Sequence, residues 1–235
     1  MIFNFKDKVV LITGSGSGLG QHLAVAFAQA GAKVAITARN LDRVKETASK
    51  LEKIDSKFIK LKLDVTSYKD CENAINETTR KFGKIDYLIN NASGYLIGWD
   101  LRKFSVEDIE KEINTTFRSV VFMTKAILNQ FLKSKHGTIV NVSSGAGLMN
   151  SESNSTIYAA DKSAVIRFSE RMHKNLSPNG IRVCCVVPCA IRDKALEKEA
   201  AVSLDDVAQA IMIQCLDKDN LAIQTMILEP KKTKK

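Results

Sequence analysis

Residues 9–20 read VVLITGSGSGLG, and this stretch decides the fold. A short apolar strand leads through a glycine-rich turn into residues 19–30, whose apolar spacing predicts a helix that stops at Gly31. Glycines permit a tight turn and a close approach to a pyrophosphate, and a helix N-terminus offers free N–H groups and a positive dipole end. The spacing is TGxxxGxG without a following GK[ST] pair, which argues against a nucleotidase phosphate loop. We predict that a dinucleotide contacts Gly14, Ser15, Ser17, Gly18, Leu19 and Gly20.

The rest of the chain alternates between apolar runs and helical patterns. Further strands are predicted at residues 33–38, 57–63, 85–89, 137–142, 181–187 and 221–228, and further helices at residues 41–53, 67–82, 106–132, 156–176 and 204–216. Most of these strands are continuously apolar, which is typical of strands buried on both faces. We predict a single α/β domain, residues 1–229, with a doubly wound Rossmann-type sheet of about seven mostly parallel strands and helices on both faces. Residues 230–235 are predicted to form a basic tail.

Composition excludes several other classes of protein. The 235 residues are 45% hydrophobic and 26% charged, and no run of 18 apolar residues predicts a membrane span. We expect no signal peptide, because the first residues lack a basic segment followed by an apolar one. No CxxC pair occurs and the five cysteines and three histidines are scattered, so we expect a cytoplasmic protein without disulfides or a metal site. The net charge of +9 is about +5 without the tail lysines, and we expect no nucleic-acid or membrane partner.

The second predicted strand ends at Ala38-Arg39, where folds that prefer NAD carry an acidic residue for the ribose 2′-hydroxyl. A cation there suits the 2′-phosphate of NADP, so NADP is favoured over NAD, although Arg39 is also explained as an ordinary surface residue. Asp64-Val65 follows the third strand at the sheet edge where ligands bind. The Asp64 carboxylate suits either an adenine amino group or the start of the helix near Ser67.

Tyr158 and Lys162 lie four residues apart on a predicted helix, and therefore on one face of it. A neighbouring ammonium group stabilises a phenolate and lowers its pKa from the ordinary value near ~10. Such a tyrosine exchanges a proton with a carbonyl or alcohol oxygen while hydride is transferred. Ser144 follows the fifth strand at the same sheet edge, where its hydroxyl is placed to hold the substrate oxygen.

With these motifs in order, the chain resembles the classical short-chain dehydrogenase/reductase family over roughly residues 5–229. The resemblance rests on TGSGSGLG, Asp64, Asn90-Asn91-Ala92, Ser144 and the Tyr158–Lys162 segment. It implies a nicotinamide cofactor, Tyr158 as acid/base, Lys162 at the nicotinamide ribose, Ser144 as substrate anchor, and cofactor contacts at Asn91, Ala92, Pro188 and Ile191. It also implies a homodimer or homotetramer formed through the helices at 106–132 and 156–176.

The chain departs from the family pattern at several positions. Ser93 replaces a glycine after Asn90-Asn91-Ala92, and Cys189 replaces a glycine after Pro188. The family's helix asparagine, part of a proton relay, aligns with Thr116. Asn114 is the alternative, about 200° away round the helix, and Thr116 is favoured as the fourth catalytic position. A threonine expected near the carboxamide reads as Asp193, and only 16 residues lead from Cys189 to Asp205, which predicts a short lid and an open pocket.

Two functions follow from these observations. The first is an NADP-dependent oxidoreductase that transfers hydride between nicotinamide and a small-molecule carbonyl or alcohol substrate, with Tyr158 as acid/base. The intact Ser144, Tyr158 and Lys162 favour it. The second is a non-catalytic NADP-binding scaffold or regulator, which the altered positions and the short lid favour.

Overall fold

The computed structural model describes residues 3–149, 155–189, 191, 201–216 and 222–231. Seven parallel strands form a sheet in the order β3-β2-β1-β4-β5-β6-β7. Their bounds are β1 Val9–Ile12, β2 Lys33–Ala38, β3 Phe58–Lys62, β4 Tyr87–Asn90, β5 Gly137–Val142, β6 Ile181–Pro188 and β7 Thr225–Leu228. This confirms the predicted α/β fold. The fourth strand begins two residues later than predicted, and the described part of the last strand is shorter.

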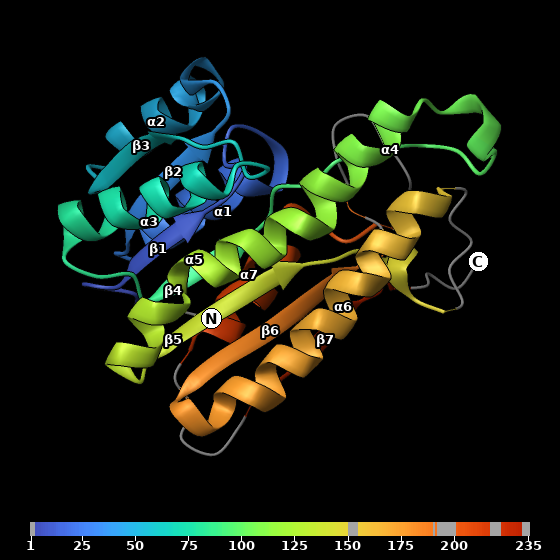
Figure 1. The fold of residues 1–235 in the computed structure, drawn as a ribbon. Coiled ribbons are helices and arrows are strands. Elements are labelled where there is room, and N and C mark those ends of the chain that lie inside the picture. The colour runs from blue at the N-terminus through green and yellow to red at the C-terminus, as the bar shows by residue number, and fades with distance from the viewer. Residues whose placement is uncertain (1–2, 150–154, 190, 192–200, 217–221, 232–235) are drawn as a thin grey trace.

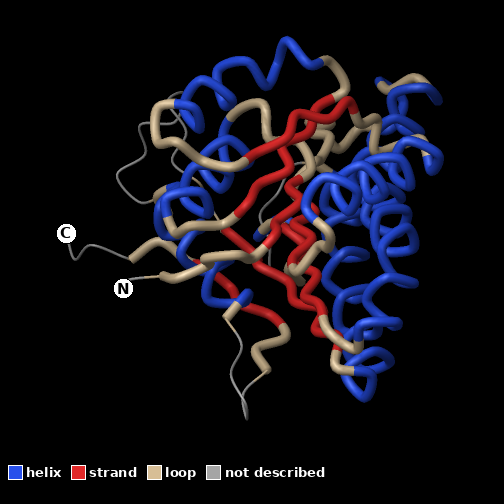
Figure 2. The backbone as a smooth tube through the Cα atoms, turned by 90° about the vertical axis from the view of Figure 1, so that its left-hand side faces the viewer, coloured by secondary structure: helices blue, strands red, loops and turns tan. Residues whose placement is uncertain are grey.

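Helices cover both faces of the sheet (Figures 1 and 2). One face carries α1 Gly18–Gln29, α2 Lys45–Glu52 and α7 Leu204–Cys215, and the other carries α3 Tyr68–Phe82, α5 Ser119–Ser134 and α6 Thr156–Leu176. Alternate residues of a strand therefore enter different cores. Val10 and Ile12 of β1 pack beneath α1, whereas Val9 and Leu11 pack on the opposite side. This two-sided burial explains the continuous apolar runs of the sequence.

The predicted helix at 106–132 is interrupted. It consists of α4 Val106–Ile113, a π-helical turn over Asn114–Arg118, and α5. Single π turns inside α-helices occur frequently at functional sites. The predicted helix at 41–53 likewise begins with a 3₁₀ turn, Leu41–Val44, whose N-cap Asn40 accepts a hydrogen bond from the Asp42 N–H.

The order of the strands indicates where on the sheet a ligand is expected to bind. From β1 the chain runs outward through β2 and β3, and then returns to pair β4 on the other side of β1. In open parallel sheets, ligands bind beyond the carboxyl ends of the strands at such a reversal. The glycine-rich turn of residues 13–18 follows β1 at this position.

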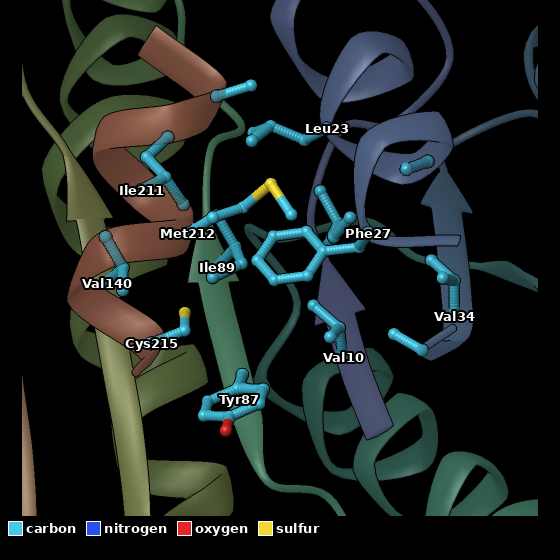
Figure 3. Packing of buried hydrophobic residues seen from close by; sticks show 14 of the residues in the cluster. Val10, Leu23, Phe27, Val34, Tyr87, Ile89, Val140, Ile211, Met212 and Cys215 are labelled. Carbon is cyan, nitrogen blue, oxygen red and sulfur yellow. The ribbon is translucent and has the colours of Figure 1, made fainter. Parts of the chain in front are cut away.

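The core beneath α1 should be sensitive to loss of volume. Phe27 is fully buried between β1, β4 and α7 (Figure 3). Its ring meets the Phe5 ring edge-on, with 5.0 Å between the centroids. We expect Phe27→Ala to lower the free energy of unfolding by about 3–5 kcal/mol in urea titrations, because the helices cannot close the cavity. Leu132→Ala, at a position 37% exposed on α5, should cost less than about 1 kcal/mol. Equal losses for the two variants would contradict this account of the core.

Candidate active site

The glycine-rich turn is tight because backbone fills the space that side chains would need. Gly14 has φ +65°, and a Cβ there would lie 3.1 Å from the Ala92 Cα. A Cβ on Gly20 would collide with the carbonyl oxygen of Gly14. The side chain of Ser17, the N-cap residue of α1, makes no capping hydrogen bond. The first N–H groups of α1 are therefore available to an anion.

A crevice of about 460 Å³ opens between this turn and the carboxyl ends of β2, β3 and β4. It is lined by Gly14, Gly16, Ser17, Leu19, Gly20, Ala38, Arg39, Asn40, Arg43, Leu63, Val65, Asn91, Ala92, Ser93 and Thr115. Eight of the residues predicted to contact the cofactor are among them: Gly14, Ser17, Leu19, Gly20, Arg39, Val65, Asn91 and Ala92. The structure thus places most of the predicted cofactor residues around a single crevice beside the glycine-rich turn.

Seven predicted cofactor residues do not line this crevice, and two of these, Tyr158 and Lys162, belong to the catalytic group described below. Ser15 is fully buried, and its hydroxyl oxygen accepts the Thr37 N–H at 2.6 Å. Asp64 accepts hydrogen bonds from the backbone N–H and the hydroxyl of Thr66, at 2.9 and 2.8 Å, in the turn that leads to α3, while the Ser67 side chain caps that helix. The remaining three are Gly18, Pro188 at the end of β6, and Ile191, which packs against the core and bridges Val202.

Asn91 braces the crevice. Its side-chain amide donates to the carbonyl oxygens of Thr13 and Gly14, at 3.0 and 3.1 Å. The Thr13 hydroxyl accepts the N–H groups of both Asn91 and Ala92 at 3.0 Å. These bonds hold the segment after β4 against the glycine-rich turn, so the two sides of the crevice are fixed relative to each other.

Two cations lie at the crevice's outer end. Arg39 follows β2, and Arg43 lies one turn later. The backbone of Arg43 packs closely against the glycine-rich turn, because a Cβ added to Gly16 would lie 2.8 Å from the Arg43 carbonyl oxygen. Both side chains are exposed, and neither forms an ion pair within the described part of the chain. Arg39 was predicted from the sequence and Arg43 was not, although a second arginine four residues further on in the same loop was a signal for it.

Tyr158 and Lys162 face the same side of α6, as predicted. The Lys162 Nζ lies 5.5 Å from the centroid of the Tyr158 ring and donates to the Val142 carbonyl oxygen at 3.0 Å. Ser144 follows β5, and its side chain hydrogen-bonds that of Tyr158. The three predicted catalytic side chains on β5 and α6 are therefore together at the carboxyl edge of the sheet.

The electrostatics of this trio differ from the expectation. Burial raises the pKa of Tyr158 above its ordinary value, and the hydrogen bond with Ser144 opposes that rise. Burial also lowers the pKa of Lys162 to about 8. The prediction that Lys162 lowers the pKa of Tyr158 is wrong, because the ammonium group is directed to the Val142 carbonyl oxygen and desolvation of Tyr158 dominates.

Thr116 occupies the centre of a hydrogen-bond network at the π turn. Its hydroxyl donates to a Glu112 carboxylate oxygen at 2.7 Å, accepts the Gly94 N–H at 2.9 Å and lies 3.2 Å from the Ser93 hydroxyl. The second Glu112 oxygen accepts the Leu96 N–H at 2.9 Å. The network ties α4 to the loop that follows β4.

The alternative to Thr116 lies elsewhere. The Asn114 side chain accepts a hydrogen bond from Arg118 at 2.9 Å in an exposed pair. Thr116, in contrast, is buried beside the segment that lines the crevice. Within the π turn, the Thr116 hydroxyl contacts the chain after β4, and the neighbouring Thr115 lines the crevice.

Two further residues of the site, Glu112 and Asp161, were not identified from the sequence, whereas Tyr95 was expected either to form a flat wall of the substrate pocket or simply to pack. Glu112 and Asp161 are buried acids on α4 and α6, and the Tyr95 ring packs edge-on against that of Tyr158 with 5.0 Å between centroids. Burial, with the charge of Glu112 adding to it, raises the pKa of Asp161 to about 6. The positions of both acids in the sequence could have indicated that they belong to the site. Glu112 lies one helical turn before Thr116, and Asp161 immediately precedes Lys162.

The remaining predictions concern metal ligands, membrane spans, the cysteines and the lid. Among the described residues, no cluster of potential metal ligands occurs, and no helix has the length and apolarity needed to span a membrane. All five cysteines lie among the described residues, and each is a free thiol. Asp193 and most of the predicted short lid lie outside the described residues.

Comparison with known proteins gives consistent matches. The profile described as short chain dehydrogenase matches residues 8–202. The "11-beta-hydroxysteroid dehydrogenase-like 4A" of Arabidopsis thaliana is 34% identical over 209 residues, which cover 88% of this chain and 69% of that protein. The structure "ElxO with NADP Bound" has a TM-score of 0.84 at 28% identity and covers 94% of this chain and 96% of that one. A 7α-hydroxysteroid dehydrogenase complexed with NADH and 7-oxo glycochenodeoxycholic acid has a TM-score of 0.87, and at 24% identity this likeness bears on the fold alone; it covers 96% of this chain and 94% of that one.

The Thr116 hydroxyl should contribute measurably to stability. We expect Thr116→Val to lower the free energy of unfolding by about 1–3 kcal/mol, because the Gly94 N–H and a Glu112 oxygen lose their buried partner. Thr116→Ser keeps the hydroxyl and should recover most of the loss. Urea titration of the three proteins measures both effects. A valine variant as stable as the wild type would show that the network contributes nothing.

Proposed function

The chain belongs to the short-chain dehydrogenase family of oxidoreductases, and from this premise we propose that it is an NADP-dependent enzyme that interconverts a small-molecule carbonyl compound and its alcohol. The observation that carries the proposal is that the glycine-rich crevice and the side chains of Ser144, Tyr158 and Lys162 lie at the same carboxyl edge of the sheet. A binding protein without chemistry would need the crevice but not these three side chains.

The described residues fit a dinucleotide. Gly14 and Gly20 leave room where a Cβ would meet backbone, and the uncapped start of α1 suits a pyrophosphate. Arg39 and Arg43 supply unpaired positive charge at the outer end of the crevice, where a ribose 2′-phosphate would bind. Asn91 holds the segment after β4 against the glycine-rich turn. This donor set supports NADP rather than NAD, because no carboxylate lines the crevice.

The side chains have separate roles in the proposed reaction. Bound NADPH supplies a hydride equivalent to the carbonyl carbon. The Tyr158 hydroxyl donates its proton to the carbonyl oxygen, which yields the alcohol and leaves a phenolate to be reprotonated from solvent. The Ser144 hydroxyl holds the substrate oxygen next to Tyr158, and Lys162 stabilises the negative charge left on the phenol oxygen.

The raised pKa of Tyr158 suits the reducing direction. A tyrosine that stays protonated at neutral pH is ready to donate a proton, whereas alcohol oxidation needs the phenolate. One observation favours the alternative, a non-catalytic NADP-binding protein: Lys162 is bonded to the Val142 carbonyl oxygen rather than placed at the phenol oxygen. NADPH binding without turnover of any ketone, quinone or oxosteroid would support that alternative.

Self-association through the long helices remains a prediction. Helices α5 and α6 lie over the same face of the sheet, which is the surface expected to pair with a second copy (Figure 1). We propose a homodimer or homotetramer.

Tyr158→Phe should separate chemistry from binding. We expect turnover of a reducible ketone to fall by about 10²–10⁴-fold, because the proton donor is lost, while the Kd for NADPH changes little. Tyr68→Phe, on α3, removes a hydroxyl away from the crevice and should retain full turnover. Steady-state kinetics and NADPH fluorescence titration provide the two readouts. Full activity of the Tyr158→Phe variant would exclude Tyr158 as the proton donor.

Arg39 and Arg43 should determine cofactor preference. We expect Arg39→Ala to weaken NADPH by roughly 10–100-fold and NADH by much less, because only NADPH carries the 2′-phosphate, and Arg43→Ala to act in the same direction. Lys45→Ala, in the same segment but paired with Asp42, is the matched control and should change neither affinity. Equal losses for NADPH and NADH would contradict the assignment of both arginines.

A further inference from the structure

The segment that follows β4 exposes a series of large apolar side chains. Tyr95, Ile97, Trp99 and Leu101, here called the apolar stripe, are between 52% and 69% exposed. The three residues between them are less exposed. Eleven large apolar side chains are exposed among the described residues, and four of these fall within residues 95–101. Single exposed apolar side chains are ordinary on a protein surface, whereas a concentration of them marks a binding surface.

The less exposed side of this segment is fixed to the helices around it. The Leu96 N–H donates to a Glu112 carboxylate oxygen on α4 at 2.9 Å, and the Gly98 carbonyl oxygen accepts the Thr156 N–H at the start of α6 at 3.1 Å. A Cβ added to Gly98 would lie 2.8 Å from the Phe104 ring, so the backbone packs closely there. The apolar stripe is therefore carried on a held backbone, and a preorganised surface loses little conformational freedom when it binds a ligand.

The apolar stripe begins at the proposed proton donor. The Tyr95 ring packs edge-on against the Tyr158 ring, with 5.0 Å between the centroids. Thr156, whose N–H holds the Gly98 carbonyl oxygen, lies two residues before Tyr158 on α6. The four residues from Tyr95 to Trp99 span at most about 14 Å. The stripe is thus continuous with the catalytic side chains, and it is long enough to contact the body of a molecule whose reacting oxygen lies at Tyr158.

The charges around the apolar stripe restrict what it can bind. Residues 93–99, SGYLIGW, contain no charged side chain. The next acid, Asp100, accepts hydrogen bonds from the Arg102 guanidinium at 2.8 and 2.9 Å, so its charge is already paired. A charged group placed on the stripe would lose water without gaining a partner, whereas an apolar group gains free energy as both surfaces leave water. The chemistry of this surface therefore favours an apolar ligand.

We propose that the apolar stripe binds the body of the substrate, and that this substrate is a carbonyl compound with a large apolar group, a long alkyl chain or a fused ring system, next to the carbonyl carbon. This inference rests on the proposed function and names the substrate class for it. The carbonyl oxygen lies at Ser144 and Tyr158, and the apolar group extends from the Tyr95 ring over Ile97 and Trp99. Bound substrate would then cover side chains that are otherwise left in water.

Trp99 permits a test that needs no turnover. It is the single tryptophan of the chain, so tryptophan emission reports on the apolar stripe alone. The probe is 2-methyl-2-octanol, whose hydroxyl group suits Ser144 and Tyr158 but whose carbinol carbon has no hydrogen to transfer. In the presence of NADP we expect a saturable shift of the emission to shorter wavelength, because the alkyl chain shields the indole ring from water. The short analogue 2-methyl-2-propanol, at the same concentrations, should leave the emission unchanged.

A pair of variants shows whether the probe binds along the stripe. We expect Ile97→Ser to raise the Kd for 2-methyl-2-octanol by about three- to tenfold, because the variant offers less apolar surface. Ile54→Ser, at an exposed apolar position beyond the end of α2, is the matched control and should keep the wild-type Kd. Both side chains are exposed, so neither substitution should prevent folding.

Three results of the fluorescence experiment would overturn the proposal. The first is an emission maximum that does not move with 2-methyl-2-octanol. The second is an equal Kd for this alcohol in Ile97→Ser and Ile54→Ser. The third is a shift caused by phosphatidylcholine vesicles but not by the alcohol, which would assign the apolar stripe to a lipid surface instead.

Kinetics with 2-alkanones, from 2-butanone to 2-decanone, separate this proposal from the proposed function. We expect kcat/KM to rise by about two- to fourfold for each added methylene group, and less steeply in Ile97→Ser than in Ile54→Ser. Turnover with a kcat/KM that does not depend on chain length overturns the proposal and leaves the enzyme assignment intact. Binding of 2-methyl-2-octanol at the stripe without turnover of any ketone supports the apolar site and counts against the proposed function.

Discussion

A parallel sheet that is covered by helices on both faces offers a ligand only its edges. The strands here are buried above and below, so polar side chains are concentrated where the strands end. The glycine-rich turn after β1, Arg39 after β2, Asn91 after β4 and Ser144 after β5 all lie at the carboxyl edge. Because all strands run in the same direction, residues distant in sequence meet there. The site follows from this constraint.

The same burial disfavours the charged forms of the side chains in the site. Tyr158 and Lys162 sit on the face of α6 that packs toward the sheet, where desolvation raises the pKa of the phenol and lowers that of the amine. Both shifts favour the neutral forms. The protein places carboxylates at Glu112 and Asp161 close to the pair, and the π turn between α4 and α5 orients the network that holds Glu112. A helix irregularity, a buried acid and the reactive pair therefore form one unit.

The sequence was sufficient for the architecture because each element had a local signal. Apolar runs predicted the strands, Gly31 and Gly83 ended helices, and the TGxxxGxG turn predicted the crevice. The π turn had no such signal, because it depends on packing between the chain after β4 and α4. The burial of Lys162 could not be predicted from the sequence either. The i, i+4 spacing places Lys162 and Tyr158 on the same face of the helix, but it does not say whether that face is exposed to water. That is why the direction of the Tyr158 pKa shift was predicted wrongly.

Transfer of deuterium from [4-²H]NADPH to a carbonyl substrate tests the central claim most directly. The two C4-deuterated stereoisomers would be supplied separately, and the alcohol product would be analysed by mass spectrometry. The account predicts one deuterium on the carbinol carbon from one stereoisomer and none from the other, because the crevice and the Ser144–Tyr158 pair fix which face of the ring meets the substrate. Oxidation of NADPH without label in the alcohol, or equal label from both stereoisomers, would contradict it.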